Sequence, residues 1–217
     1  MTSTPTVPVT LDVWADIACP WCFIGHRQLD AVVRPDAGDV HVVHRAFQLQ
    51  PEMPPRGRPY AEFLTETFGA ADVVHQIFDR VIAVGHDVGI AFNFSDMPVA
   101  PNSELAHRAL ALVTDLMAQR RAVEALFSAF FENALDITDQ AVVVRTVSHA
   151  AGLDPLELVA ALNRGEGADS VERDQQESRE LGISAVPTFV ADMRFAVQGA
   201  QPPEVLRGVI DQARAFV

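Results

Sequence analysis

Two cysteines, the only ones in the chain, lie three residues apart in the segment Cys19-Pro20-Trp21-Cys22. Two thiols at this spacing can interconvert between a dithiol and a disulfide. The apolar stretch Val9–Ala15 precedes the pair and predicts a strand, while Phe23–Val33 follows it with a helical pattern. We therefore expect redox chemistry at a junction between a strand and a helix.

The predicted junction gives the two sulfurs different tasks. Cys19 falls at the helix N-terminus, where unpaired backbone N–H groups and the positive end of the helix dipole stabilise a thiolate. Cys19 is then the nucleophile. Pro20 suits the first helical turn, because its missing N–H would have no partner there. Cys22, nearly one turn further on, is expected to be less exposed and to act as the resolving thiol.

Two other uses of a cysteine pair fit less well. A zinc site needs three or four protein ligands, and no second cysteine pair or close histidine pair follows Cys22. A purely structural disulfide across so short a loop removes little chain entropy. We expect neither a metal nor an organic cofactor.

Charge and hydropathy exclude several classes of partner. The 217 residues carry a net charge of −13, and all sixteen basic residues are arginine. Such a field repels phosphate backbones, which argues against nucleic-acid binding. No apolar run approaches the roughly 20 residues of a membrane span, and Met1–Thr10 lacks the features of a secretory signal. We expect a cytoplasmic protein that does not act at a membrane.

The chain is longer than a redox fold of about 100 residues, so a second lobe is expected. Val40–Leu49 reads as a strand, and several prolines then interrupt regular structure before a long helical region. The predicted helical segments are Tyr60–Phe68, Ala71–Val88, a stripe from Leu105 to Leu116 capped by Asn102 or Ser103, Ala122–Phe131, a helix capped by Thr138 that runs to Ala151, a helix that starts at Asp154-Pro155 and ends at Gly165, and a solvated helix over Ser170–Leu181.

Strand character returns near the C-terminus. Thr188–Ala191 and Phe195–Val197 read as short strands, and Pro203 opens an amphipathic helix. An N-terminal βαβ unit would thus be completed by a C-terminal ββα unit. This predicts an α/β thioredoxin fold interrupted by an all-helical insertion, with residues 1–56 and 183–217 in the first domain and residues 57–182 in the second.

The run Cys19-Pro20-Trp21-Cys22-Phe23-Ile24-Gly25 resembles the active-site segment of DsbA-like thioredoxin-fold oxidoreductases of the FrnE branch. Further segments occur in that family's order: Ala100-Pro101-Asn102-Ser103, Ala106-His107-Arg108, Ala125-Leu126-Phe127, Phe130-Phe131, the run from Gly182 to Val190, and Gly199-Ala200-Gln201-Pro202. The resemblance covers nearly the whole chain. It implies a cis Val186–Pro187 bond beside the disulfide, with the Val186 backbone free to pair with an extended substrate. The alternative is a trans proline that opens an edge strand.

Val186, Pro187 and Trp21 are the substrate-binding residues that this resemblance implies. One departure concerns the buried acid that many relatives carry six positions before the first cysteine, because Val13 occupies that position here. Asp16 and His26 are the nearest replacements, and both are expected to be surface residues that could relay protons through water. His107 and His149 receive no role.

The predicted activity is thiol–disulfide exchange, in which Cys19 attacks and Cys22 resolves the mixed disulfide. Its partners would be proteins that carry disulfides or thiols, together with glutathione or another small thiol. Two alternatives remain open. One is an isomerase or glutathione-dependent transferase that acts on a small aromatic or polyketide-like molecule, although such relatives generally have serine at the first site position. The other is a redox-sensing holdase whose helical lobe binds partner proteins.

Overall fold

A four-stranded sheet lies at the centre of the fold in the computed structural model, which describes residues 8–33 and 38–216. The strand order is β2-β1-β5-β6, in which β1 is parallel to β2 and antiparallel to β5, and β5 is antiparallel to β6. The strands are β1 (Val9–Ala15), β2 (Val40–Ala46), β5 (Thr188–Ala191) and β6 (Phe195–Gln198). Residues 1–7, which include most of the segment searched for a secretory signal, lie outside the described ranges.

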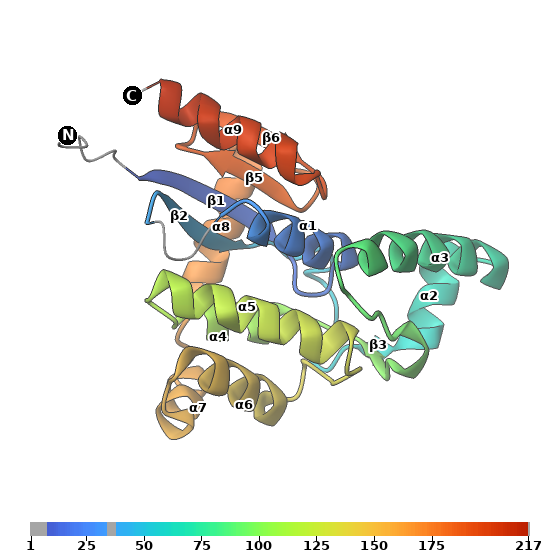
Figure 1. The fold of residues 1–217 in the computed structure, drawn as a ribbon. Coiled ribbons are helices and arrows are strands. Elements are labelled where there is room, and N and C mark those ends of the chain that lie inside the picture. The colour runs from blue at the N-terminus through green and yellow to red at the C-terminus, as the bar shows by residue number, and fades with distance from the viewer. Residues whose placement is uncertain (1–7, 34–37, 217) are drawn as a thin grey trace.

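Helices cover both faces of this sheet. Helix α1 (Pro20–Asp30) contacts α9 (Pro203–Ala215), which packs on β1, β5 and β6. Helix α8 (Ala168–Glu180) lies behind the strands in the view of Figure 1, on the opposite face from α9. The central strand β1 is buried along nearly its whole length because it has a neighbouring strand on each side and helices on both faces. The predicted βαβ and ββα units, and with them the thioredoxin fold, are confirmed.

The remaining elements stand between β2 and α8 in the chain. Figure 1 shows α2 and α3 extending beyond the N-terminal end of α1, and α6 and α7 below α5. These elements are β3 (Arg58–Pro59), α2 (Tyr60–Phe68), α3 (Ala71–Asp87), a short 3₁₀ turn (Phe94–Asp96), β4 (Val99–Ala100), α4 (Glu104–Ala111), α5 (Leu116–Phe131), α6 (Gln140–Ala151) and α7 (Pro155–Asn163). One hydrophobic core runs from the sheet into α4, α5 and α6. The division of the chain into a thioredoxin-like domain and a helical domain, at residues 57 and 182, stays a prediction. No helix in the described part of the chain is long and apolar enough to cross a membrane.

Several predicted boundaries were wrong, and at one of them a polar cap interrupts a continuous apolar stripe. The stripe from Leu105 to Leu116 belongs to two helices, since α4 ends at Ala111 and the Asp115 carboxylate caps α5 by accepting from the Ala118 N–H at 2.7 Å. Helix α5 therefore starts six residues before the predicted Ala122. Two other ends also moved: α1 ends at Asp30 instead of Val33, and β2 ends at Ala46 instead of Leu49.

At α6 the capping residue is Asp139, whose side chain accepts from the Ala141 N–H, and not Thr138. The Thr138 side chain donates to Asp136 instead. At α4 the N-cap position is Ser103, whose side chain makes no capping bond, and the Asn102 side-chain oxygen Oδ1 accepts from the Glu104 N–H at 2.9 Å instead.

The expectation that Ser170–Leu181 forms a solvated helix was wrong for the face that packs on the sheet, while the opposite face is exposed. Val171 on α8 is 3% exposed, and the Asp174 carboxylate accepts from the Ala46 N–H at 2.9 Å. The Trp14 indole N–H donates to the Asp174 carbonyl oxygen at 3.1 Å. A charged residue can thus face a sheet when it satisfies backbone groups at the end of a strand. Helix α8 packs on the sheet through these contacts.

Candidate active site

Cys19 and Cys22 lie where β1 gives way to α1. Cys19 is the N-cap of α1, with an extended backbone (φ −101°, ψ 115°), and Pro20 follows at the first helical position. The Cys19 carbonyl oxygen accepts from the N–H groups of Cys22 and Phe23 at 3.0 and 3.3 Å. Cys22 is 1% exposed and Cys19 is 4% exposed. The predicted helix N-terminus and the predicted order of exposure are both confirmed.

The peptide bond between Val186 and Pro187 is cis, as the resemblance implied. It lies beside the cysteines, because the Cys19 Sγ atom is 3.9 Å from the Val186 carbonyl oxygen. Pro187 also packs closely on α1, since a Cβ atom added to Gly25 would lie 2.8 Å from Pro187 Cγ. The loop before β5 thus meets the first turns of α1, although Cys19 and Val186 are 167 positions apart.

The two sulfurs affect each other electrostatically. Burial raises the pKa of the Cys22 thiol well above its usual value, and the hydrogen bond and charge of Cys19 raise it further. The charge of Asp16 acts in the same direction. Cys22 therefore stays protonated at neutral pH unless a neighbouring group accepts its proton.

Asp16, in the turn between β1 and α1, was expected at the surface and is instead 1% exposed. Its Oδ1 atom accepts from the Ala18 N–H at 3.0 Å, and its Oδ2 atom accepts from the Leu49 N–H at 2.7 Å. The His107 Nε2 atom lies 3.5 Å from Oδ1. Burial alone would raise the pKa of Asp16, but His107 and the two backbone N–H groups outweigh burial and hold this pKa below its usual value. Asp16 is therefore a buried carboxylate whose charge these contacts stabilise.

His26 was also expected at the surface, and it is 4% exposed. Its Nε2 atom lies 3.4 Å from Glu124 Oε2 and 3.8 Å from Asp30 Oδ2. Burial, and then the charges of Arg120 and Arg27, lower the pKa of His26 to about 3. Burial raises the pKa of Glu124 to about 7. His26 is therefore neutral at pH 7, so its contact with Glu124 is not an ion pair despite the short distance.

His26, Asp30 and Glu124 place three possible metal-ligand atoms within 4.8 Å of one another. Arginines already bind both carboxylates: Arg27 is 2.5 Å from Glu124, and Arg120 donates to Asp30. These contacts account for the cluster as an ion-pair network between α1 and α5, so we do not assign it a metal.

A mainly apolar cavity of about 370 Å³ opens beside Cys19. Pro20 and Trp21 form part of its wall near the sulfur, and Asp16 also reaches it. The Arg80 guanidinium lies 5.9 Å from the centre of the Trp21 ring, a cation–π distance. The rest of the wall comes from Ala18 and from residues between β2 and α6: Leu49, Gln50, Met53, Tyr60, Phe63, Leu64, Thr67, Phe68, Ile77, Phe78, Val81, Phe94, Ala100, Pro101, Ser103, Phe130 and Phe131.

The sequence did not reveal two parts of this site. His107 received no role, because a single histidine on a partly apolar helix carries no signal of its partner, which is Asp16 at the end of β1. The aromatic side chains that line the cavity could not be ranked, because they come from α2, α3, α5 and the loops between them. The motif Phe130-Phe131 was the available signal, and both side chains line the cavity.

Known proteins share both the sequence pattern and the fold. The family described as a DSBA-like thioredoxin domain matches residues 10–211. A probable DsbA oxidoreductase from Streptomyces coelicolor is 31% identical, and its crystal structure matches with a TM-score of 0.83 over 96% of this chain and 91% of that one.

Two other solved structures match at lower identity. The cytosolic disulfide reductase DsbM from Pseudomonas aeruginosa, solved with GSH, is 18% identical, with a TM-score of 0.62 over 95% of this chain and 96% of that one. A 2-hydroxychromene-2-carboxylate isomerase is 13% identical, with a TM-score of 0.69 over 94% and 95%. These two show the fold alone.

Membership of the FrnE branch stays a prediction. The match over residues 10–211 and the 31% identity over nearly the whole chain lead to one conclusion: the chain belongs to the DsbA-like thioredoxin domain family.

Proposed function

We propose that this chain is a thiol–disulfide oxidoreductase that reduces, forms or isomerises disulfides in protein substrates through Cys19 and Cys22. The observation that carries this proposal is the position of the Cys19 sulfur. It lies at the N-terminus of α1 and 3.9 Å from the Val186 carbonyl oxygen, where a substrate strand and a thiolate can meet.

The exchange takes two steps. The Cys19 thiolate attacks one sulfur of the substrate disulfide, and the electron pair of the broken S–S bond leaves on the other substrate sulfur. Cys22 then loses its proton and attacks Cys19 Sγ, which releases the second substrate thiolate and oxidises the cysteine pair. A thiol donor such as glutathione returns the pair to the dithiol by the reverse reaction. In the oxidising direction the same steps run backwards.

Val186, Pro187 and Trp21 would hold the substrate. The Val186 backbone lies beside Cys19 and can pair with an extended segment, while Trp21 borders the cavity. A large apolar side chain next to the substrate cysteine would then enter the cavity, since none of the described residues that line it is basic. We also propose that the protein acts in the cytoplasm, where a reducing thiol pool favours reduction or isomerisation of disulfides.

Turnover of a model protein disulfide, with dithiothreitol as the electron donor, tests this proposal. The wild-type chain should accelerate reduction, and Cys19→Ser should abolish the acceleration. Arg164→Ser serves as the matched control, because Arg164 follows α7 with an exposed side chain. Full activity of Cys19→Ser would refute the assigned nucleophile.

The cavity also favours a second candidate, an isomerase or transferase that acts on a small aromatic molecule. Its volume lies within the range of about 300–1,000 Å³ for small-molecule pockets, and its wall is rich in aromatic side chains. Such chemistry needs one thiolate and no resolving cysteine. Cys22→Ser therefore separates the two candidates, because it should stop catalytic disulfide turnover and spare an isomerase.

A further inference from the structure

Among the described residues, the Nε2 atom of His107 is buried and has no hydrogen-bond partner. His107 on α4 is 5% exposed, and its Nε2 atom is 3.5 Å from Asp16 Oδ1, close enough for an ion pair but outside hydrogen-bond geometry. Both oxygens of Asp16 already accept backbone N–H groups, from Ala18 and Leu49. A buried ring nitrogen beside a fixed carboxylate can accept a proton, because the carboxylate stabilises the charge that results.

Asp16 connects this histidine to the cysteines. Its carbonyl oxygen accepts from the Cys19 N–H at 3.0 Å, its side chain borders the same cavity as Cys19, and its charge acts on the Cys22 thiol. Val13, on β1 before the cysteine pair, is 3% exposed and apolar, so it offers no acceptor for a proton. The proton of Cys22 therefore needs an acceptor other than residue 13.

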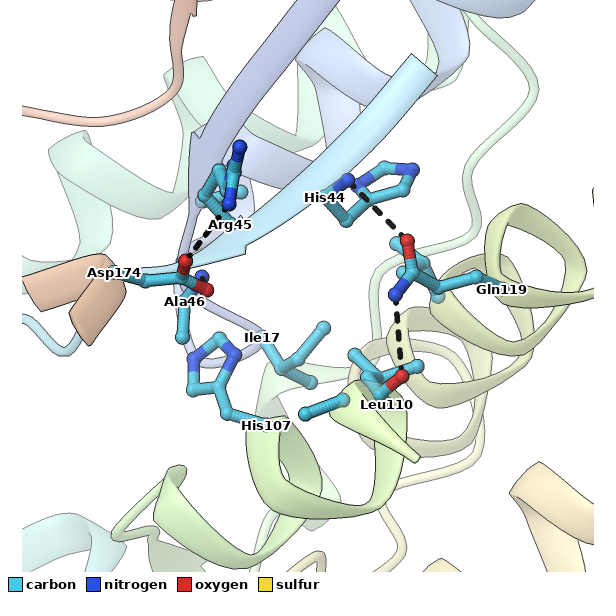
Figure 2. Close-up of a pocket in the computed structure, with 11 residues that line it drawn as sticks. Ile17, His44, Arg45, Ala46, His107, Leu110, Gln119 and Asp174 are labelled. Carbon is cyan, nitrogen blue, oxygen red and sulfur yellow. Dashed lines mark hydrogen bonds and ion pairs between the residues drawn. The ribbon is translucent and has the colours of Figure 1, made fainter. Parts of the chain in front are cut away.

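A second, smaller cavity of about 30 Å³ borders His107, and Figure 2 shows its lining. The His107 ring and the Asp174 carboxylate lie on one side of it, while His44 and Gln119 lie on the other. Its size suits one water molecule, and its polar side chains supply the partners that such a water needs. Asp174 bonds to Arg45, whose side chain is 31% exposed, so this cavity leads toward solvent.

We propose that the Asp16–His107 pair accepts the proton of Cys22 during resolution and passes it through the small cavity to solvent. The Cys22 S–H bond breaks, and its proton ends on His107, which Asp16 then holds as an imidazolium. The Cys22 thiolate attacks Cys19 Sγ, a Cys19–Cys22 bond forms, and the electron pair of the old S–S bond leaves on the substrate sulfur. The substrate thiolate that leaves is protonated from solvent.

This inference rests on the proposed function, and a single experiment tests the two separately. Mixing the reduced protein with an excess of Ellman's reagent, an aromatic disulfide with a coloured thiolate product, gives two phases. The first reports attack by Cys19 and depends on reagent concentration. The second phase reports resolution by Cys22 and does not depend on reagent concentration. Cys22→Ser should retain only the first phase. A wild-type chain with neither phase would refute the proposed function itself.

His107→Gln is the informative variant, because glutamine fills similar space and can donate to Asp16 but cannot take a proton. We expect its second phase to slow at least about tenfold at pH 7, within the range for loss of a general base, while the first phase stays within about twofold. The slowed phase should rise about tenfold per pH unit as hydroxide replaces the lost acceptor. His149→Gln, on an exposed position of α6, should match the wild type.

The pH dependence of the second phase in the wild-type protein tests the relay without any substitution. The groups that face His107 are Asp16 before α1, Asp174 on α8, and His44 and Arg45 on β2, while α5 contributes the neutral Gln119. The second phase should depend on pH much less steeply than tenfold per unit through neutrality, because an internal acceptor takes the place of hydroxide. A wild-type second phase that rises tenfold per pH unit through neutrality would overturn the relay. The relay would also be overturned if His107→Gln slowed both phases equally, or slowed neither phase.

Discussion

The Cys19 Sγ atom lies 3.9 Å from the carbonyl oxygen of Val186, a residue 167 positions away in the chain. This contact joins the N-terminus of α1 to the loop that leads into β5. The strand pairing of β1 with β5 fixes the distance, because Trp14 pairs with Thr188 just before the cysteines and just after the proline. A change in the packing of α1 against this loop should therefore alter the site.

Gly25→Ala is one such change. Its new Cβ would lie 2.8 Å from Pro187 Cγ and 3.2 Å from Phe189 Cζ, and both partners are buried, so one of them must shift. We expect a loss of about 1–3 kcal/mol in the free energy of unfolding, which urea denaturation measures. Turnover of a protein disulfide should fall more than Cys19 alkylation by a small reagent.

Gly208→Ala provides the matched control inside α9. A Cβ at Gly208 would meet nothing within 4 Å, so only helix propensity changes, and we expect a gain of up to about 1 kcal/mol. If Gly25→Ala proved as harmless as Gly208→Ala, the tight packing between α1 and the Pro187 loop would be wrong.

Alkylation should distinguish the two thiols. Burial holds the pKa of Cys22 well above its usual value, whereas Cys19 borders the large cavity at a helix N-terminus. A limiting amount of iodoacetamide at pH 7 should therefore label Cys19 at least about tenfold faster than Cys22, as peptide mass spectrometry can show. Equal labelling of both cysteines in the folded protein would contradict this order.

The apolar cavity should select among substrates. Phe63→Ala removes one aromatic wall from α2, and we expect turnover of peptide disulfides with an aromatic residue beside the cysteine to fall about tenfold, equivalent to about 1.4 kcal/mol. Peptides with serine at that position should be turned over as before. Leu156→Ala, at a 78% exposed position on α7, controls for loss of an apolar side chain. An equal effect of Phe63→Ala on both peptides would remove the cavity from substrate selection.

Acid should destabilise the protein through His26. Its pKa of about 3 in the folded state lies below the unfolded value of about 6.5, so between these values the unfolded chain binds more protons and stability falls as pH falls. Glu124, with a pKa of about 7 against 4.5, gives the opposite slope between pH 4.5 and 7. The buried His44, whose pKa is also lowered, adds to the slope of His26.

The His26 slope is therefore clearest below pH 4.5. Urea unfolding at pH 4.5 and 3.5 should show His26→Gln losing about 1.4 kcal/mol less than the wild type across that unit, the equivalent of one proton. His75→Gln provides the comparison, because His75 is exposed on α3 and should leave the slope unchanged. Parallel slopes for wild type and His26→Gln would contradict the lowered pKa.

The sequence predicted the elements that local chemistry determines. The cysteine spacing, Pro20 and the strand before it located the N-terminus of α1, and the alternation of strands and helices at both ends of the chain led to the sheet. Asp154-Pro155 predicted a helix start that the structure confirms, with the Asp154 carboxylate accepting from the Leu156 N–H.

Long-range partners could not be predicted in this way. Asp16 and His26 looked like surface residues because nothing near them in the chain indicates His107 or Glu124, which bury them. Helix α8 looked solvated for the same reason, since the groups that satisfy Asp174 belong to β2. Burial of a polar side chain depends on partners that only the fold brings together.

The most direct test of the account is to trap the mixed disulfide. Cys22→Ser should accumulate a covalent adduct with a protein substrate under non-reducing conditions, and peptide mapping should place the bond at Cys19. Cys19→Ser should accumulate none. An adduct that forms equally well in Cys19→Ser, or a Cys22→Ser variant that forms none while still turning over protein disulfides, would contradict Cys19 as the attacking thiol.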